Sequence, residues 1–526
     1  MKELRLSIAI PLACVVFSAD STKAIDLSQI SGGDAYFQYS SSRGPVEICI
    51  VPRHLPGGSY SKDDASDEIN LCQMMTPFHT QRDVQISSQP TRILARERMN
   101  RASELFLLCP KLNSTNPGTL FVELENGMSV DEARQKFCPL DHRARTLIET
   151  ASVDAKFKQS TSCSDTSSAL AAYHLSRLFG GIGRTPVSVL RTMSKDTHLD
   201  LARSASTILG SSKEAIAQTW SRLMSLHSGN PSAPEVQRVF SRDMQVIVGA
   251  LSKNVKREFK YTPLNRASAY DTRYSDFKGS IGWKRVTSSG SISEMAQAPQ
   301  SEFEKIVPAM VQAKDVSDMI LLDVLLNQQD RIGNIHFKLA WYIKTTDGFQ
   351  RDGLKKDRIP GLDEQKEIIE NFLRKAPNLA TEDELHRAGR KLAERIFPGK
   401  QVTLVREMIL KDNDCGVTKS NMMRKENYLE SVRRMSPETY SRFIAFAKKL
   451  LRGEGEEYQN IKAYFEKDLV FSAASFDGRS GSSYSFRDNV IFAYNTLTSA
   501  CKAGRLKLDL DLKGQLTGQW PQVSCE

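Results

Sequence analysis

The order of apolar and polar positions divides the chain into short strands and longer helices. Apolar runs of about four to eight residues predict buried strands, and apolar residues three and four positions apart predict helices. The strands predicted in this way are 186–193, 337–344 and 402–410. The predicted helices are 169–180, 212–226, 234–253, 303–328, 364–375, 382–397 and 436–451. This mixture over 526 residues predicts an α+β class with two to four core-bearing units.

Local signals refine some of these boundaries. Gly180 and Gly181 follow one helix as a C-terminal stop, and Ser436 with Pro437 begins another. The segment 147–160 reads as strand, turn and strand. The tail from 469 reads as short strand-like pieces separated by Gly and Ser turns.

The N-terminus has a short charged region, an apolar run from Leu6 to Ala19 and then small residues. This order is typical of a removable secretory signal over 1–24, and the apolar run is shorter than the roughly 20 residues of a membrane span. After removal of the signal we expect no integral membrane span. The predicted location is therefore secreted, periplasmic or the lumen of the secretory pathway.

Cysteine usage agrees with an oxidising compartment. Of nine cysteines, Cys14 lies in the predicted signal and eight remain, an even number that fits disulfide bonds. No CxxC spacing is present, which disfavours a zinc ribbon. The pairing stays open, although Cys501 and Cys525 are the nearest pair near the C-terminus. Cys415 is expected to be disulfide-bonded or buried rather than nucleophilic.

Composition, charge and the absence of some motifs limit the classes of function that the sequence predicts. With 40% hydrophobic and 25% charged residues the chain is expected to fold, and its net charge of +10 comes from basic residues mixed with acids. Such mixing is typical of solvated helix faces, so we expect no nucleic-acid partner. The GxSxG, HExxH and GxxxxGK[ST] motifs are absent from the sequence.

Three separate places carry the groups that phosphoryl transfer requires: a lysine, oxygen ligands for Mg²⁺ or Mn²⁺, and a carboxylate at the acceptor hydroxyl. Lys158 lies on a predicted strand, with Lys156 on the same face. Asp330 follows the long helix, and Asp412 closes a strand, with Asp414 two residues later. Each group alone also fits an ordinary surface, helix-end or turn position. Their order along the chain favours phosphotransfer.

These segments together resemble a known family. FKQS, ALAAYHLSRLFGGIGRTPVSVLRTM, DVLLNQQDR and DNDCG resemble the secretory-pathway kinases related to four-jointed and the Golgi casein kinase. That family belongs to the atypical kinases, which include CotH, HipA-type and phosphoinositide kinases. The resemblance covers about 145–450 and implies a two-lobed kinase-like fold that uses ATP with Mg²⁺ or Mn²⁺.

The resemblance also implies roles for individual residues. Lys158, assisted by Lys156, would bind the nucleotide phosphates, and Asp330 would orient or deprotonate the acceptor. Asp412 would bind the metal, with Asn334 and Asp414 as further ligands. Arg331 would support the loop rather than take part in the chemistry.

The chain departs from the family pattern in several places. Asn334 comes four residues after Asp330, where five is usual in this group, so it binds metal in a shortened loop or caps a turn. Ala169 stands where the family has the glutamate that pairs with the lysine, so either another acid, such as Asp165, pairs with Lys158, or Lys158 is unpaired. Asp347 is a rival metal ligand nearer in the chain. Asp323 lies on or beside the buried helix stripe and needs a partner.

No convincing glycine-rich phosphate loop precedes Lys158, and the GGIGR cluster lies after the helix. His142, His174 and His336 are too dispersed to predict a metal site, and His174 fits a satisfied core histidine. Asp412 follows Asp330 by 82 positions, which predicts an insertion at about 345–400.

The predicted domains are a signal peptide, an irregular, disulfide-bearing N-terminal extension, a small lobe, a large lobe and a tail. Their ranges are 1–24, 25–140, 141–195, 196–468 and 469–526. The expected function is a secreted or periplasmic Ser/Thr protein kinase acting on a protein substrate. The alternatives are a pseudokinase that binds or scaffolds, and an enzyme that transfers AMP or uses a non-protein acceptor. The sequence leaves the oligomeric state open.

Overall fold

The computed structural model describes most of the chain. It covers 33, 35–86, 105–125, 127–151, 153–256, 258–265, 272–353, 382–478 and 483–526. The predicted signal 1–24 and the predicted helix 364–375 lie outside these residues.

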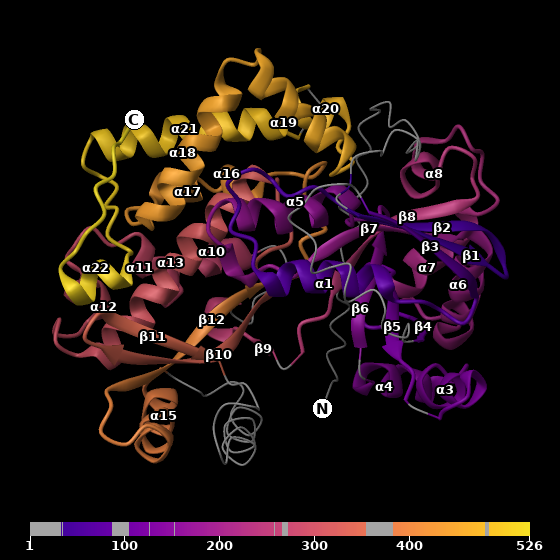
Figure 1. Ribbon diagram of the computed structural model, residues 1–526, viewed down its shortest axis with the longest axis horizontal. Helices are drawn as coiled ribbons and strands as arrows, with labels where there is room; N and C mark the ends of the chain where they lie inside the picture. The colour runs from indigo at the N-terminus through magenta and orange to yellow at the C-terminus, as the bar shows by residue number, and fades with distance from the viewer. Residues whose placement is uncertain are drawn as a thin grey trace, which may run out of the picture.

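An antiparallel sheet of eight described strands forms one half of the molecule, in the order β3-β1-β2-β7-β8-β6-β5-β4 (Figure 1). The strands are β1 (Ala35–Ser41), β2 (Gly44–Val51), β3 (His79–Ile86), β4 (Phe106–Pro110), β5 (Thr119–Glu123), β6 (Val153–Gln159), β7 (Ser188–Ser194) and β8 (Val246–Lys253). In β6, Ala155, Phe157 and Gln159 are buried, so the period of two places Lys156 and Lys158 together on the other face.

Helices connect and cover this sheet. They are α1 (Lys62–Gln73), α3 (Val130–Phe137), α4 (His142–Thr150), α5 (Thr166–Leu178), α6 (Lys195–Leu209), α7 (Ala215–Leu226) and α8 (Pro234–Val239). A short 3-10 turn, η3 (Ile182–Arg184), joins α5 to β7. The buried strand at 186–193 is confirmed as β7.

Three sequence predictions are wrong in this half. Residues 147–150 belong to α4, and Val246–Lys253 form strand β8 rather than the end of a helix. An apolar run such as VIVGAL satisfies both patterns, and pairing with β6 and β7 decides in favour of a strand. The N-terminal extension was also expected to be irregular, but β4 and β5 pair onto β6, so the sheet crosses the predicted boundary at 140.

The second half is mainly helical. Its helices are α9 (Thr262–Asn265), α10 (Arg273–Phe277), α11 (Ile281–Val286), α12 (Ile292–Ala296), α13 (Phe303–Leu325), α15 (Glu382–Ile396), α16 (Met422–Lys425), α17 (Tyr428–Ser431), α18 (Pro437–Leu451), α19 (Glu456–Lys467), α20 (Ala473–Asp477), α21 (Phe486–Lys502) and α22 (Leu512–Thr517). α13 lies at its centre, packed against β12, α11, α12 and α21 (Figure 1). The predicted N-cap of α18 is confirmed, since Ser436 Oγ accepts from the Thr439 backbone N–H. The expected strand-like tail is wrong, because α20, α21 and α22 occupy it.

A smaller sheet in this half brings distant residues together. Its strands are β9 (Phe259–Lys260), β10 (Ile335–Thr345), β11 (Gly348–Gly353) and β12 (Val402–Leu410). β10 and β12 pair antiparallel from Ile335 opposite Leu410 to Ile343 opposite Val402. This register places Asp330, just before β10, and Asp412, just after β12, at the same end of the sheet.

Four disulfides join the eight expected cysteines in the described residues. They are Cys49–Cys72, Cys109–Cys138, Cys163–Cys415 and Cys501–Cys525. The expectation for Cys415 is confirmed. Within the described ranges, no helix is both long and apolar enough to cross a membrane.

Candidate active site

A pocket lies where β6, β7 and β8 meet the end of β12. The space between these elements is about 530 Å³ when the mouth open to solvent is included. Small side chains leave this room, namely Ala169 of α5, Ser188 of β7, and Ala250 and Ser252 of β8. The polar part of its lining consists mainly of lysines and aspartates from β6 and from the loop after β12.

Lys158 joins the two halves of the molecule. Its Nζ lies 2.9 Å from Asp412 Oδ1 and 2.7 Å from Asp414 Oδ1, carboxylates that follow it by 254 and 256 positions. Burial alone would lower the pKa of Lys158, but these two carboxylates raise it, so the ammonium stays charged. The site therefore contains a buried, charged lysine between two acids.

The field of several lysines keeps Asp412 ionised. Burial would raise the pKa of this carboxyl, but the charges of Lys158, Lys111, Lys156 and Lys411 hold the pKa well below its ordinary value. Asp412 also adopts a φ of 53°, in the left-handed region that a non-glycine residue enters at a cost of about 1–3 kcal/mol. An ionised carboxylate in a constrained backbone is a suitable ligand for a hard cation.

The N-terminal end of α5 fixes the loop that carries these acids. The Asp165 backbone N–H donates to the Asp414 carbonyl at 2.7 Å, and Ser168 Oγ donates to the Asn413 carbonyl at 2.7 Å. Ser164 Oγ donates to Asp414, and the Cys163–Cys415 disulfide closes the arrangement. The loop is thus attached to the segment that directly follows Lys158.

Arg331 fixes the same loop from the other side. Its guanidinium forms a bidentate pair with Asp323 of α13, with Nε 2.9 Å from Oδ2 and Nη2 2.9 Å from Oδ1. It also donates to the Lys411 carbonyl at 3.0 Å and to Asn413 Oδ1 at 2.6 Å. The partner expected for Asp323 is therefore Arg331, whose contacts are those of a supporting residue.

Asp330 lies near the two loop acids. Arg273 of α10 forms an ion pair with it, and Asn334 Nδ2 donates to its backbone oxygen at 2.8 Å and to Oδ2 at 3.1 Å. Burial raises the pKa of Asp330, Arg273 opposes this, and the charges of Asp412 and Asp414 raise it further. The charges of Asp412 and Asp414 thus act on Asp330, which is not among the residues that line the pocket, and its raised pKa suits a proton acceptor.

Other predicted residues have different positions. Asp165 caps α5, with its side chain accepting from the Ser167 and Ser168 backbone N–H groups at 3.0 and 3.4 Å, so it is not the acid that pairs with Lys158. Asp347 lies in the turn between β10 and β11, at the end of β10 that is far from Asp330 and Asp412. The length of the extended strand puts it roughly 30 Å from these two acids. Asp347 is therefore too far away to bind the same metal ion as Asp412. Lys156 lines the pocket beside Lys158, and burial lowers its pKa.

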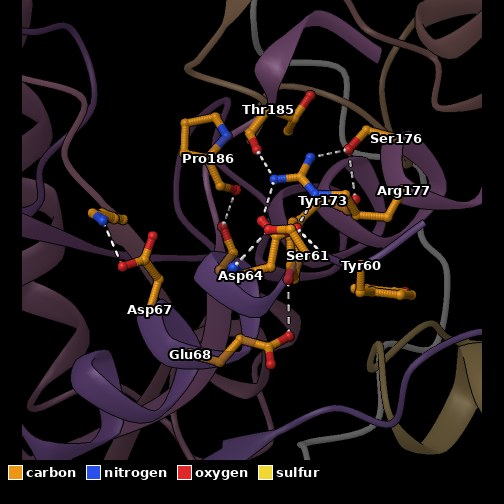
Figure 2. A network of polar contacts seen from close by, with 12 residues as sticks. Tyr60, Ser61, Asp64, Asp67, Glu68, Tyr173, Ser176, Arg177, Thr185 and Pro186 are labelled. Atoms are coloured by element: carbon orange, nitrogen blue, oxygen red, sulfur yellow. Dashed lines mark hydrogen bonds and ion pairs between the residues drawn. The ribbon is translucent and has the colours of Figure 1, made fainter. Parts of the chain in front are cut away.

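A polar network behind the site holds α5 against α1 (Figure 2). The Arg177 guanidinium donates to both carboxylate oxygens of Asp64 at 3.0 and 2.8 Å. Tyr173 Oη donates to Glu68 at 2.9 Å, and Tyr60 Oη lies 2.8 Å from His174 Nδ1. The disulfide-bearing N-terminal part therefore contributes directly to the position of α5.

Two residues of the site were not found from the sequence. Arg273 precedes its partner Asp330 by 57 positions and has no local motif. Lys111 begins the β4–β5 turn, KLNSTNPG, and its charge acts on Asp412. An Asn-Pro-Gly turn between two apolar strands is a hairpin signal that could have drawn attention to this loop.

Comparison with known proteins adds no relative. No protein-family model matches the chain, and no curated protein matches its sequence. In the described residues, no group of three or more His, Cys, Asp or Glu side chains is arranged to hold a metal ion. The carboxylate oxygens of Asp412 and Asp414 nevertheless fit Mg²⁺ or Mn²⁺, because Mg²⁺ is usually bound by one or two carboxylates together with substrate phosphates.

Proposed function

We propose that the chain is an ATP-dependent phosphotransferase of the atypical kinase type, acting on Ser or Thr of a protein in a secretory or extracellular compartment. The observation that carries this proposal is the pair of ion pairs from Lys158 to Asp412 and Asp414 at the wall of an open pocket. A lysine for phosphates and an aspartate for metal are the parts on which kinase chemistry depends.

The arrangement of the large sheet supports the same proposal. Lys158 lies on the third strand of the β4–β5–β6 meander, and α5 follows it before β7. In protein kinases the phosphate-binding lysine also lies on a third strand, beneath a loop that covers the phosphates. The residues directly after β8, Asn254 and Val255, line the pocket where a nucleotide base would enter.

The chain's own residues would divide the chemistry as follows. Lys158 binds and orients the triphosphate, and Asp412, with Asp414 and Asn334 Oδ1, would hold Mg²⁺ or Mn²⁺, which neutralises charge developing on the phosphates. Asp330 accepts the proton of the Ser or Thr hydroxyl while the hydroxyl oxygen bonds to the γ-phosphorus. The bond from that phosphorus to the bridging oxygen breaks, and ADP leaves with the bonding electrons.

Two observations favour binding without turnover. Ala169 offers no carboxylate to Lys158, and Asp330 is already ion-paired with Arg273. A pseudokinase with this site would bind nucleotide and present a surface to a partner. Transfer of AMP is the third possibility, and the position of the label in ATP separates it from phosphoryl transfer.

The test is label incorporation by the full chain produced through an oxidising compartment, with Mg²⁺ or Mn²⁺ and a mixture of Ser/Thr peptides. The variants are Asp330→Asn and Asp412→Asn, and the matched control is Asp347→Asn, an exposed acid in the distant turn. We expect label from γ-labelled ATP in the wild type and the control only. Label from α-labelled ATP would instead indicate AMP transfer. No label, with a thermal shift by ATP and metal, would indicate the pseudokinase.

A further inference from the structure

The loop between β4 and β5 covers the lysine of the site. Gly118, at the end of this loop, is so close to β6 that an added Cβ would lie 3.0 Å from the Phe157 carbonyl oxygen and 3.5 Å from Lys158 Cγ. The same Cβ would lie 3.9 Å from Lys111 Cδ. The stems of Lys111 and Lys158 therefore run past the same glycine.

The loop is held in place along its length. The Lys111 backbone N–H donates to the Gly118 carbonyl at 2.8 Å and closes the turn. Trp220 Nε1 of α7 donates to the Lys111 carbonyl at 3.0 Å, and Thr219 Oγ1 donates to the Thr115 carbonyl at 3.0 Å. The helices inserted between β7 and β8 thus support a loop that lies elsewhere in the chain, and they fix the start of the Lys111 side chain.

The surroundings of the Lys111 ammonium are unusual for a buried lysine. The residue is only 8% exposed, and in the described part of the chain no carboxylate lies within ion-pair distance of it. Burial and the charge of Lys158 lower its pKa to about 7, Lys156 lowers it too, and Asp412 and Asp414 act in the opposite direction. Both of these acids already pair with Lys158. Burying such an ammonium is costly unless an anion joins it.

We propose that Lys111 is a second phosphate-binding lysine, which together with Lys158 clamps the polyphosphate of the nucleotide in place of a glycine-rich loop. This inference rests on the proposed function, because it assigns a further contact to the same nucleotide. The pocket lining includes Lys158 and not Lys111, whose stem lies beside that of Lys158 at Gly118. A polyphosphate bound between the two ammonium groups would give Lys111 the anionic partner that the described residues do not supply.

Binding of ATP and of AMP, each with Mg²⁺, tests the role by calorimetry on the full chain. We expect Lys111→Met to weaken ATP binding at least tenfold while changing AMP binding less than twofold, and Lys111→Arg to restore most of the loss. Lys136→Met, an exposed lysine of α3, is the control and should bind both like the wild type. An equal loss for ATP and AMP, or no loss for ATP, would overturn the role of Lys111.

A second measurement needs no variant. An amine-reactive reagent followed by peptide mass spectrometry reports the accessibility of Lys111 in the wild type. We expect ATP with Mg²⁺ to protect Lys111 at least fivefold and adenosine not to protect it. Equal labelling with and without ATP, in a protein that binds ATP, would overturn the inference alone. A wild type that binds no nucleotide would overturn the proposed function, and the inference with it.

Discussion

Replacing Arg331 with Met would test how the loop of Asp412 is held. Arg331 and Asp323 are each only 1% exposed in their side chains, and their pairing is bidentate. The arginine is also the donor to the Lys411 carbonyl and to Asn413 Oδ1. The substitution therefore leaves one buried carboxylate and two further acceptors without their cation.

The size of the effect follows from burial. Removing one partner of a buried ion pair costs about 3–5 kcal/mol, so we expect the free energy of unfolding of Arg331→Met to fall by about 4 kcal/mol near pH 8. The double variant Asp323→Leu with Arg331→Met leaves no buried charge and should lose only about 2 kcal/mol, mainly for the two unsatisfied acceptors.

The pH dependence has a definite sign. Burial raises the pKa of Asp323 and Arg331 opposes this rise, so the pKa rises further in the variant. An acid whose folded pKa lies above its unfolded value of about 3.9 stabilises the protein at low pH and loses that contribution as pH rises through the folded pKa. The deficit of Arg331→Met should therefore shrink between pH 8 and pH 5.

Urea unfolding without reductant, followed by circular dichroism at both pH values, measures these differences. Arg442→Met is the matched control, because Arg442 forms an i,i+4 pair on the surface of α18, where such pairs contribute about 0.3–0.5 kcal/mol. A loss below about 1 kcal/mol in Arg331→Met, or a deficit equal at pH 8 and pH 5, would refute the reasoning.

Three further outcomes follow from the site. Cys163→Ser removes a disulfide that spans 252 positions and should lower the free energy of unfolding by about 5 kcal/mol. Loss of the Cys501–Cys525 disulfide should lower it by about 3 kcal/mol, and denaturation without reductant compares the two variants. Arg273→Met removes the cation that lowers the pKa of Asp330, so the acid limb of the pH profile of kcat/KM should move to higher pH; an unmoved limb would exclude Asp330 as the base. ATP and Mg²⁺ should each bind at least tenfold more tightly in the presence of the other, which calorimetry can measure; independent binding would contradict the exchange of partners argued below.

Sequence patterns predicted a helix or strand correctly where its own residues contain the periodicity or the capping residue that defines it. The helix at α13, the strands β7, β10 and β12, and the Ser436 cap of α18 are fixed by local periodicity or capping. The same logic was available for α21, whose Ser485 and Asp488 form a capping box that was read as a turn. Its omission was an error of interpretation rather than a lack of signal.

The remaining errors concern contacts between distant segments. Whether VIVGAL becomes helix or strand depends on β6 and β7, which no local pattern contains. Asp165 was one candidate partner for Lys158, but its carboxylate caps α5 by accepting from the Ser167 and Ser168 N–H groups. The sequence predicted catalytic or binding roles for Lys158, Asp330 and Asp412. The β10–β12 register, which brings the two aspartates to the same end of the small sheet, is visible only in the structure.

The pairing of Lys158 with two aspartates is consistent with a site that exchanges partners on binding. Lys158 balances both carboxylates and lowers the cost of burying them. Nucleotide alone would take Lys158 from the acids and leave two buried carboxylates beside phosphates of the same charge. Metal alone would compete with the lysine for the same oxygens. Under the proposed function, only both together would replace each lysine–carboxylate contact with a lysine–phosphate and a carboxylate–metal contact. Coupled binding is therefore expected from this geometry, whether or not turnover follows.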